Sequence, residues 1–466
     1  METKKKLSGR EKFAYGLGAV GKDMVYMFSA SYILYYYQDI LGVSAIAMGI
    51  ILMAARVFDA FNDPIMGVLV AKTKTKWGKF RPWLFIGTLM NAVVLYLMFA
   101  APPSLNGSGL VAYAAVTYIL WGVTYTMMDI PYWSMIPAFT ESGKEREGLS
   151  ALARSCAGVG SAIISIITVM TVAALGNAFG SGSDDELTGF KFFGLGVAVL
   201  FIVFITVTCA VVKEKSTVEM ESVSVGDMFK ALIANDQAMT IVVAIVMINT
   251  ALYITQNLLI YFFKYDFSPE AWQGNYTLFN TCGGGFQILA MMLMFPLLRK
   301  FMNTMKIFTT SFVMALVGYV IILIISASGT SNVYILLIPA FLIMSAIGML
   351  NVVITIFLAN TVDYGELKNG RRDESVIFSM QTFVVKLASG ISALIASVVL
   401  TVFHIQKDEE GVLSTLDAGQ RLGLRGCMTI IPIVVLIIGY IVYKKNYVLT
   451  DEKLEEITEE LNSKRA

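Results

Sequence analysis

Apolar stretches long enough to cross a bilayer recur along the whole chain, and this pattern limits the fold more than any other feature. Of the 466 residues, 56% are hydrophobic and only 15% are charged, whereas soluble domains carry about 25% charged residues. A helix needs roughly 20 apolar residues to span the hydrocarbon core. The sequence therefore predicts an all-α membrane protein with twelve transmembrane helices, at 13–37, 43–71, 82–101, 110–137, 149–175, 189–212, 238–263, 274–299, 304–327, 332–360, 374–402 and 422–446.

Composition and motifs exclude several other classes of protein. The net charge is +1, and no basic patch with interleaved aromatic residues is present, so nucleic acid is not an expected partner. The single histidine, His404, excludes a histidine proton relay. No nucleophile elbow, Walker loop or zinc motif occurs, so we expect no enzyme and no cofactor. Four cysteines lie singly in apolar segments, without metal-ligand or disulfide spacing: Cys156, Cys209, Cys282 and Cys427.

The distribution of lysine and arginine predicts the orientation. Basic residues gather after every second segment and are missing after the first, third and ninth; the long loop near 407–425 is an exception that also carries acids. By the positive-inside rule, both termini are cytoplasmic. The first segment is too long for a signal peptide. We expect a multi-pass protein of the cell membrane (plasma or inner).

The basic loops also indicate an internal repeat. The loop near Lys76 has a counterpart near Met302, and the loop at Lys144 has one at Lys368, each about 225 residues further on. We expect two six-helix halves, at 1–212 and 238–446, with a cytoplasmic middle loop at 213–237 and a short helical tail at 447–466. This organisation resembles the major facilitator fold, in which substrate binds in a central cavity between the halves.

The second segment contains charges that a membrane-spanning helix normally avoids. Asp59 and Asp63 are four residues apart and share one helical face, with Arg56 three positions before Asp59. Intramembrane charges face a bundle interior or a water-filled cavity. Two acids for one base leave a net negative site that suits a small cation. The alternative is an internal ion pair that only fixes helix packing.

Polar residues in the first and fourth segments fit a sugar. Asp23 in the first segment and Asp129 in the fourth can accept hydrogen bonds from hydroxyl groups, while Trp133 can cover the apolar face of a sugar ring. Thr126, Asp129 and Trp133 lie on one helical face. Two alternatives stay open: Lys22 and Asp23 could form a neighbouring pair at the cytoplasmic interface, and Trp133 could be an aromatic-belt residue beside a structural Asp–base pair.

Two further bases lie in apolar surroundings. Arg154 and Lys386 are separated by nearly the repeat offset, so they are candidates for equivalent positions in the two halves. Before Lys22 is counted, the intramembrane acids outnumber the bases, so a bound cation would complete the charge balance. The acids are Asp23, Asp59, Asp63 and Asp129; the bases are Arg56, Arg154 and Lys386.

These residues, in this order, resemble the glycoside–pentoside–hexuronide:cation symporters of the major facilitator superfamily, and within them the sodium-coupled melibiose carriers. The resemblance extends from about residue 11 to residue 443. Its most specific blocks are Tyr15–Asp23, Arg56–Gly67, Trp77–Trp83, Tyr118–Trp133, Thr361–Glu366 and Gln381–Lys386.

The resemblance implies a role for each matching residue. Asp59 and Asp63 would bind the cation, with Asn62 and Thr126 as neutral oxygen ligands and Lys386 as the base that approaches them. The expected substrate-binding residues are Asp23, Tyr36, Tyr125, Asp129, Trp133, Arg154, Asn351 and Lys386; Tyr36 and Tyr125 are included because an acid with aromatic residues on the same helix suits a sugar, and not because of the resemblance. The expected gate or hinge residues are Arg56, Asp363, Glu366, Arg372 and Glu374.

Two positions depart from the melibiose carriers. Asn351 stands where those carriers have a tryptophan that faces the sugar, which puts the identity of the sugar in question. Asn360 replaces an acid before Val362 and Asp363, which affects only the gate.

The expected function is uptake of a sugar, a melibiose-like glycoside, coupled to Na⁺, Li⁺ or H⁺ by alternating access, in a monomer embedded in the lipid bilayer. A cation-coupled lysolipid or amphiphile carrier of the same fold is the first alternative, which the acids Asp23 and Asp129 disfavour. A non-transporting sensor is the second, disfavoured by short loops and the lack of a soluble domain.

Overall fold

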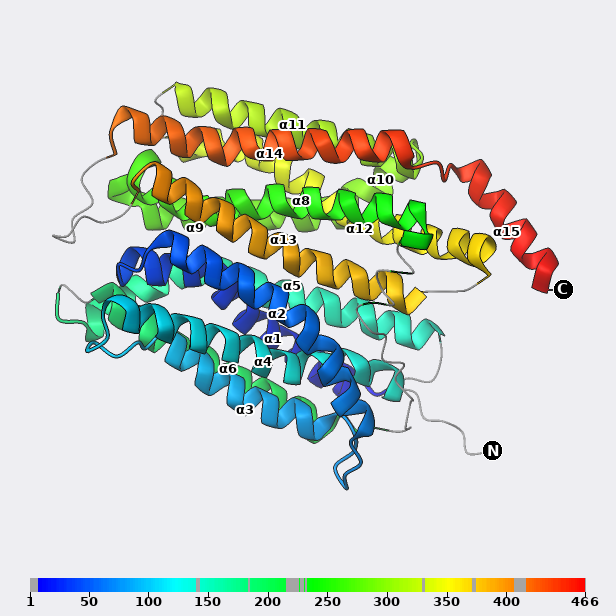
Figure 1. Cartoon of the computed structure of the whole chain (residues 1–466), viewed down its shortest axis with the longest axis horizontal. Coiled ribbons are helices and arrows are strands. Elements are labelled where there is room, and N and C mark those ends of the chain that lie inside the picture. The colour runs from blue at the N-terminus through cyan, green and yellow to red at the C-terminus, as the bar shows by residue number, and fades with distance from the viewer. Residues whose placement is uncertain are drawn as a thin grey trace. The chain divides into compact units, whose positions relative to one another are not determined.

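The protein is built almost entirely from long helices (Figure 1). The computed structural model describes residues 7–139, 143–182, 185–214, 226, 230, 233–328, 332–370, 374–405 and 416–465. The chain forms two compact units, Met1–Ser222 (unit 1) and Val223–Ala466 (unit 2).

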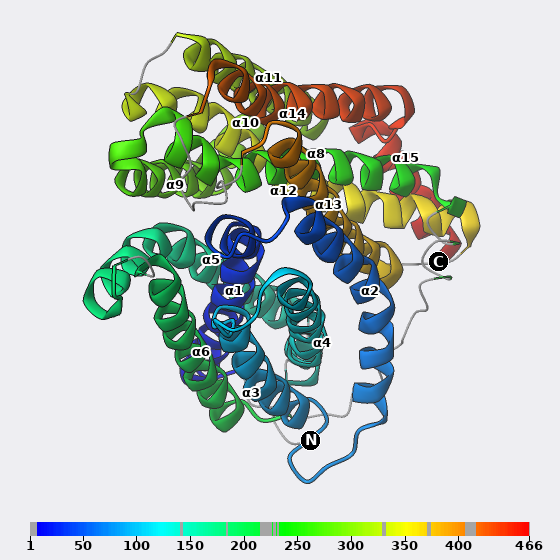
Figure 2. The same ribbon diagram turned by 60° about the vertical axis from the view of Figure 1, so that its left-hand side comes forward.

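Unit 1 packs its helices in a definite scheme. Helix α1 lies against α5 and α6, α3 lies against α4 and α6, and α2 lies against α4 (Figure 2). The elements are α1 (Gly9–Tyr35), its π-helical continuation η1 (Tyr36–Ile40), α2 (Ala45–Lys72), α3 (Arg81–Met98), α4 (Gly107–Phe139), α5 (Gly143–Phe179) and α6 (Asp185–Val211).

Unit 2 contains more elements. They are α8 (Asp236–Tyr261), its π-helical continuation η2 (Phe262–Phe267), η3 (Pro269–Ala271), α9 (Trp272–Leu289), η4 (Ala290–Met294), α10 (Phe295–Arg299), α11 (Thr304–Ala327), α12 (Val333–Asn369), α13 (Glu374–Val402), α14 (Ala418–Asn446) and α15 (Asp451–Arg465). Helix α8 packs against α13 and α14, α11 packs against α12 and α14, and α9 packs against α12.

The two units share one packing scheme. The helix pairs of unit 1 reappear in unit 2 when α1 to α6 are matched in order with α8, α9, α11, α12, α13 and α14. The first long helix of each unit also ends in a π-helical turn, η1 and η2, about 226 residues apart. One difference is that α5 packs along α6 in unit 1, whereas the matching helices α13 and α14 of unit 2 contact each other only locally. The repeat indicated by the basic loops is therefore also present in the packing.

Each of the twelve predicted segments coincides with helix. Within the described ranges, eleven helical segments are long and apolar enough to cross a membrane. Helix α1, with 27 residues, is about 40 Å long but is not in this group, because it carries Lys22 and Asp23 at its centre and charges in its first turns. The prediction of an all-α fold of membrane-crossing helices is confirmed.

Short polar side chains begin several helices as capping theory expects. Ser8 and Glu11 form a reciprocal capping box at α1, and Asp417 forms one with Gln420 at α14. Asn235 and Asn303 accept a backbone N–H at the starts of α8 and α11. These caps satisfy backbone donors that a membrane interface would otherwise leave unpaired.

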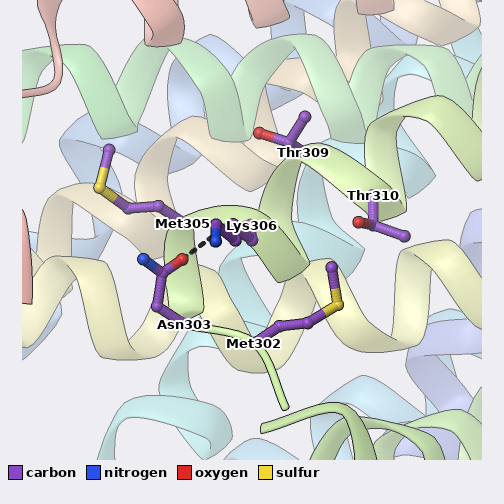
Figure 3. Close-up of a pocket in the computed structure, with 6 residues that line it drawn as sticks. All are labelled: Met302, Asn303, Met305, Lys306, Thr309 and Thr310. Atoms are coloured by element: carbon purple, nitrogen blue, oxygen red, sulfur yellow. Dashed lines mark hydrogen bonds between the residues drawn. The ribbon is translucent and has the colours of Figure 1, made fainter.

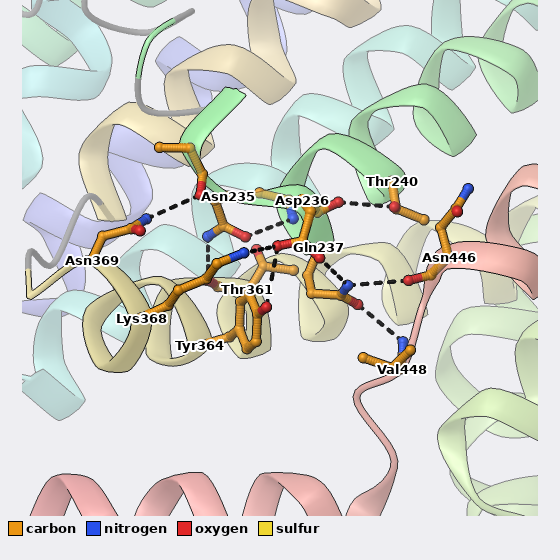
Figure 4. Close-up of polar contacts among 12 residues, drawn as sticks. Asn235, Asp236, Gln237, Thr240, Thr361, Tyr364, Lys368, Asn369, Asn446 and Val448 are labelled. Carbon is orange, nitrogen blue, oxygen red and sulfur yellow. Dashed lines mark hydrogen bonds and ion pairs between the residues drawn. The ribbon is translucent and has the colours of Figure 1, made fainter.

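A polar junction joins the start of α8 to the end of α12 (Figure 4). Asp236 accepts from Lys368 at 2.5 Å and from Tyr364 at 3.1 Å, and the Asn235 amide donates to the Thr361 carbonyl at 2.7 Å. These hydrogen bonds hold the start of α8 against the end of α12 within unit 2.

The same junction holds the tail. Gln237 donates to the Asn446 carbonyl at 3.1 Å and accepts from the Val448 amide at 3.0 Å. Tyr447 is buried, which raises the pKa of its hydroxyl, and Ile457 and Leu461 of α15 join the core of unit 2. The expected helical tail is therefore present as α15, docked on its own unit.

Glu214, just after α6, caps the first turn of α3. Its carboxylate accepts from the backbone N–H groups of Lys79, Phe80 and Arg81 at 2.7, 2.9 and 3.1 Å. Gly78 has a φ of +104° and lies so close that a Cβ there would be 2.4 Å from a Glu214 oxygen. The preceding loop therefore requires glycine at this position.

We expect Gly78→Ala to destabilise unit 1. The left-handed backbone costs a non-glycine residue about 1–2 kcal/mol, and the new methyl group would displace the Glu214 carboxylate. The apparent Tm in detergent should fall by several degrees. Gly274→Ala, at a helical position with open space, is the control and should leave Tm unchanged or higher; equal Tm values for the two variants would contradict this account.

Candidate functional site

Lys22 occupies the centre of the candidate site. Its Nζ lies 2.9 Å from Asp23 Oδ1 and 2.8 Å from Asp129 Oδ1, so one ammonium joins α1 to α4. The residue is only 3% exposed. Lys22 and Asp23 do form the neighbouring pair of the alternative, but the lysine is buried and has a second partner, Asp129, on another helix.

Aromatic and hydroxyl groups complete this cluster. The Trp133 indole donates to Asp129 Oδ1 at 3.1 Å, and the Ser161 hydroxyl donates to Asp23 Oδ2 at 3.2 Å. The Trp133 ring centroid lies 4.9 Å from Lys22 Nζ and 4.7 Å from Arg154 Cζ, within cation–π range. We call Lys22, Asp23, Tyr125, Asp129, Trp133, Arg154 and Ser161 the α1–α4 cluster; Tyr125 belongs to it because Lys22 donates to its hydroxyl at 3.4 Å.

A reciprocal tyrosine contact supports the cluster one turn away. Tyr15 donates to the Tyr132 carbonyl at 2.5 Å, and Tyr132 donates to the Tyr15 carbonyl at 2.6 Å. The two rings stack with centroids 4.4 Å apart. This contact fixes the register of α1 against α4, so the carboxylates of Asp23 and Asp129 are held at the spacing that Lys22 bridges.

The second group of charges lies on α2 and faces α4. Arg56 Nη1 lies 3.3 Å from Asp59 Oδ2, and both residues are 4% exposed. The guanidinium carbon is 5.7 Å from the Tyr26 ring and 6.0 Å from the Trp121 ring. Asp59 packs so closely on α4 that a Cβ at Gly122 would lie 2.7 Å from its Oδ1.

Asp63 extends this group by one helical turn. It accepts a hydrogen bond of 2.9 Å from the Thr126 hydroxyl of α4. Asn62 is three positions after Asp59, on a neighbouring part of the same face, and its side-chain nitrogen is buried without a hydrogen-bond partner among the described residues. We call Arg56, Asp59, Asn62, Asp63 and Thr126 the α2–α4 cluster.

The two clusters differ in how their carboxylates are partnered. In the α1–α4 cluster, two carboxylates accompany the cations of Lys22 and Arg154. In the α2–α4 cluster, Arg56 pairs with Asp59, and Asp63 accepts from the Thr126 hydroxyl. The first cluster can therefore hold a neutral polar molecule, and the two carboxylates of the second can hold a monovalent cation.

One expected substrate residue lies elsewhere in unit 1. Tyr36 is fully buried and packs against Tyr37, Phe99 and Phe190. It is 13 residues beyond Asp23, about 20 Å along the helix. The structure does not bring Tyr36 to either cluster.

The remaining expected residues lie in unit 2. Asn351 is exposed at the midpoint of α12, Lys386 is half-buried in α13, and Asp363 and Glu366 are half-buried in the last turns of α12. Glu374 begins α13, with its side chain outside the description, and Arg372 lies outside the described residues. Arg154 and Lys386 occupy the matching helices α5 and α13 of the shared packing scheme.

Three residues that shape these clusters were not among the residues predicted to form the sites. Gly122 admits the Asp59 carboxylate, Ser161 binds Asp23, and Lys22 joins the two acids. The signal for Lys22 was its place at the centre of a membrane-length helix, too far from either end for its ammonium to reach water. Nothing in the sequence singled out Ser161 among the serines of its segment.

A group of three or more histidine, cysteine or acidic side chains placed to hold a metal ion is not found in the described part of the chain. Beside Asp59 and Asp63, the α2–α4 cluster contains two neutral groups with oxygen atoms, the Thr126 hydroxyl and the Asn62 carboxamide.

A family model described as MFS/sugar transport protein matches residues 14–451. The chain belongs to this family. It is therefore a membrane transporter of the sugar-transport type and not an enzyme, and the family-level resemblance to glycoside–pentoside–hexuronide:cation symporters is confirmed.

Characterised relatives cover most of the chain at modest identity. The isoprimeverose transporter of Lactiplantibacillus pentosus is 29% identical over 84% of this chain and 80% of its own length. The raffinose carrier protein of Pediococcus pentosaceus is 26% identical over 97% of this chain and 71% of its own. The lactose permease of Lactobacillus helveticus is 25% identical over 99% and 73%.

Solved structures are similar in fold. A bacterial homolog of the human lysosomal transporter Spinster, in an inward-facing and unoccupied conformation, has a TM-score of 0.66 at 12% identity and covers 96% of this chain and 97% of its own. The nucleoside transporter NupG has a TM-score of 0.63 at 12% identity and covers 93% of this chain and 99% of its own. The predicted major facilitator fold is confirmed.

Lys22→Gln should lower thermal stability before any ligand is added. Removing one member of a buried ion pair costs about 3–5 kcal/mol; Asp23 and Asp129 keep 22% and 21% side-chain exposure, so we expect the lower end. The double variant Lys22→Gln/Asp129→Asn should recover part of the loss, because one unpaired acid is removed. Lys12→Gln, on the exposed first turn of α1, is the control, and a Tm loss as large there would contradict the assignment.

Proposed function

We propose that the chain takes up a neutral glycoside together with a monovalent cation, Na⁺ first and Li⁺ or H⁺ as substitutes. The α1–α4 cluster binds the sugar, and the α2–α4 cluster binds the cation. Both termini lie in the cytoplasm, and the monomer works in the cell membrane.

The chemistry of the α1–α4 cluster supports a sugar. Asp23 and Asp129 supply acceptors for hydroxyl hydrogens, Arg154 supplies donors for hydroxyl oxygens, and Trp133 supplies an aromatic face. The balanced charge of this cluster suits a neutral ligand. A sugar that enters must displace part of the Lys22 pairing, so its hydroxyl groups have to replace the contacts that it removes.

The α2–α4 cluster supports an alkali cation. It combines two carboxylates, one hydroxyl and one carboxamide. Oxygen ligands of this kind bind small hard cations.

The single observation that carries cation coupling is the role of α4 in both clusters. Thr126 holds Asp63, and Asp129, three residues later on the same face, holds Lys22. Gly122 on the same helix receives Asp59. A cation that binds both Asp59 and Asp63 would shift the position of α4, because both acids contact this helix. Helix α4 also carries half of the proposed sugar contacts. Each ligand then raises the affinity for the other by an equal factor.

The energetics suit concentrative uptake. One positive charge moving down the membrane potential releases about 2.3 kcal/mol per 100 mV. The neutral sugar moves with it, so each turnover can work against a sugar gradient as the two units alternate in access. Relatives whose names state isoprimeverose, raffinose and lactose support a glycoside as the substrate class, and a melibiose-like glycoside is our first candidate.

A lysolipid or amphiphile carrier is the less favoured alternative. The α1–α4 cluster presents four charged side chains and few apolar ones, which suits hydroxyl groups better than an acyl chain. Failure of lysolipids to compete with labelled sugar in proteoliposomes would separate the two functions.

Paired variants test the division between the clusters. In proteoliposomes with Na⁺, Li⁺ or H⁺ gradients, Asp59→Cys should abolish cation-driven accumulation and leave labelled-sugar counterflow partly intact. Asp129→Asn should do the opposite, because a lost hydroxyl acceptor costs about 1–3 kcal/mol of sugar affinity while cation binding remains. Wild-type accumulation in Asp59→Cys would remove that residue from the cation site.

Asn351→Trp tests selectivity. Its amide is exposed at the centre of a membrane-crossing helix, where polar groups usually face a cavity or another helix. If it contacts sugar, the indole should change the ranking across a glycoside panel and leave the cation requirement unchanged. Asn360→Asp, half-buried further along the same helix, is the control. An unchanged ranking would mean that Asn351 does not contact the sugar.

A further inference from the structure

An open cavity of about 280 Å³ lies at the start of α11 in unit 2 (Figure 3). Its lining combines one ammonium group, two hydroxyl groups and two thioethers. The lining residues are Met302, Asn303, Met305, Lys306, Thr309 and Thr310. The Asn303 side chain already accepts a hydrogen bond of 2.9 Å from the backbone N–H of Lys306. The polar groups that the cavity offers to a ligand are therefore side chains, and not backbone donors at the helix end.

The two threonines present free donors to this cavity. Most threonines in the helices of this protein donate to the carbonyl four residues earlier, as Thr88, Thr124 and Thr168 do. Among the described residues, no hydrogen bond is formed by the hydroxyl of Thr309 or Thr310. Figure 3 shows both hydroxyl oxygens on the side nearer to Lys306. One ammonium and two hydroxyl donors therefore line a space of about 280 Å³, which is large enough for a phosphate group.

A continuous apolar stripe leads away from this cavity along α11. At about 100° per residue, Lys306, Thr310 and the apolar residues that follow lie within about 40° of one line. The apolar members are Val313, Val317, Val320 and Ile324, which are 51%, 44%, 44% and 63% exposed. Phe301, at the mouth, is 80% exposed. A cationic and hydroxylated end followed by an exposed apolar stripe has the layout of a phospholipid, with its phosphate at one end and its acyl chain along the helix.

We propose that this cavity is a binding site for an anionic phospholipid. Lys306, Thr309 and Thr310 hold the phosphate, Met302 and Met305 contact the glycerol region, and the stripe on α11 carries an acyl chain. Lys300 adds positive charge beside the site. Arg299, whose guanidinium lies 4.0 Å from the Asp451 carboxylate, donates to the Met302 carbonyl at 3.2 Å and shapes the cavity wall. The positive-inside rule places this end of α11 in the cytoplasmic leaflet, where anionic lipids gather.

The test uses the full-length protein, delipidated in detergent and titrated with phosphatidylglycerol, phosphatidylcholine or inorganic phosphate. Bound lipid is counted by native mass spectrometry and stability by thermal unfolding. Phosphatidylglycerol should bind and raise Tm more than phosphatidylcholine does. Lys306→Gln should weaken phosphatidylglycerol binding about fivefold, the equivalent of about 1 kcal/mol per lysine near an anionic surface.

Two further variants keep the test decisive. Thr310→Val, which preserves side-chain shape, should weaken binding about two- to fivefold, and it carries the test if Lys306→Gln does not fold. Lys445→Gln removes one exposed charge at the end of α14 and should bind lipid like the unchanged protein. Equal losses in Lys306→Gln and Lys445→Gln, equal binding of the two lipids, or equal protection by inorganic phosphate would each overturn the proposal.

Discussion

The contact on which unit 1 depends is the bridge from one lysine to two carboxylates. An unpaired ion in a membrane interior is so unfavourable that it would take up or lose a proton instead. Lys22 avoids this penalty for three ions at once, because its Nζ lies within 2.9 Å of both Asp23 and Asp129. Since the two acids belong to α1 and α4, the bridge also fixes how these helices pack. The same atoms therefore hold two helices together and form the polar centre of unit 1.

This sharing explains how a polar site can exist within apolar helices. The Tyr15–Tyr132 contact joins the two helices through backbone carbonyls, and the Trp133 indole donates to Asp129 Oδ1. The carboxylates therefore have partners besides Lys22, since Ser161 also donates to Asp23. Under the proposed function, sugar hydroxyls would replace part of the Lys22 contacts, because a hydroxyl group can satisfy a carboxylate as an ammonium does.

Periodicity and charge predicted a large part of this arrangement. The Arg56–Asp59 pair follows directly from a spacing of three residues, and the twelve helices follow from the apolar stretches. Which helices pack against one another was harder to predict from the sequence. That Lys22 reaches Asp129 depends on the crossing of α1 and α4, which local spacing does not encode. Tyr36 was predicted as a ligand because it follows the acid Asp23 on the same helix, yet it lies in an aromatic core with Phe99 and Phe190. Aromatic composition alone cannot separate a binding face from a packed face.

The repeat shows that the two units have divided their chemistry while keeping their packing. Unit 1 carries charges at the centres of α1 and α2, whereas the charge pairs described in unit 2 lie at its ends. Asp236 pairs with Lys368 at one end, and Asp266 forms a bidentate pair with Arg425 at the other, at 2.6 and 2.7 Å. End pairs tie helices together without occupying the membrane interior. The central base of unit 2 is Lys386, on the helix that matches the one bearing Arg154. Unit 1 therefore contains the four acids expected at the binding sites, and unit 2 contributes Lys386 and the amide of Asn351. An asymmetry of this kind follows if a duplicated six-helix unit keeps its scaffold and concentrates its ion chemistry in one copy.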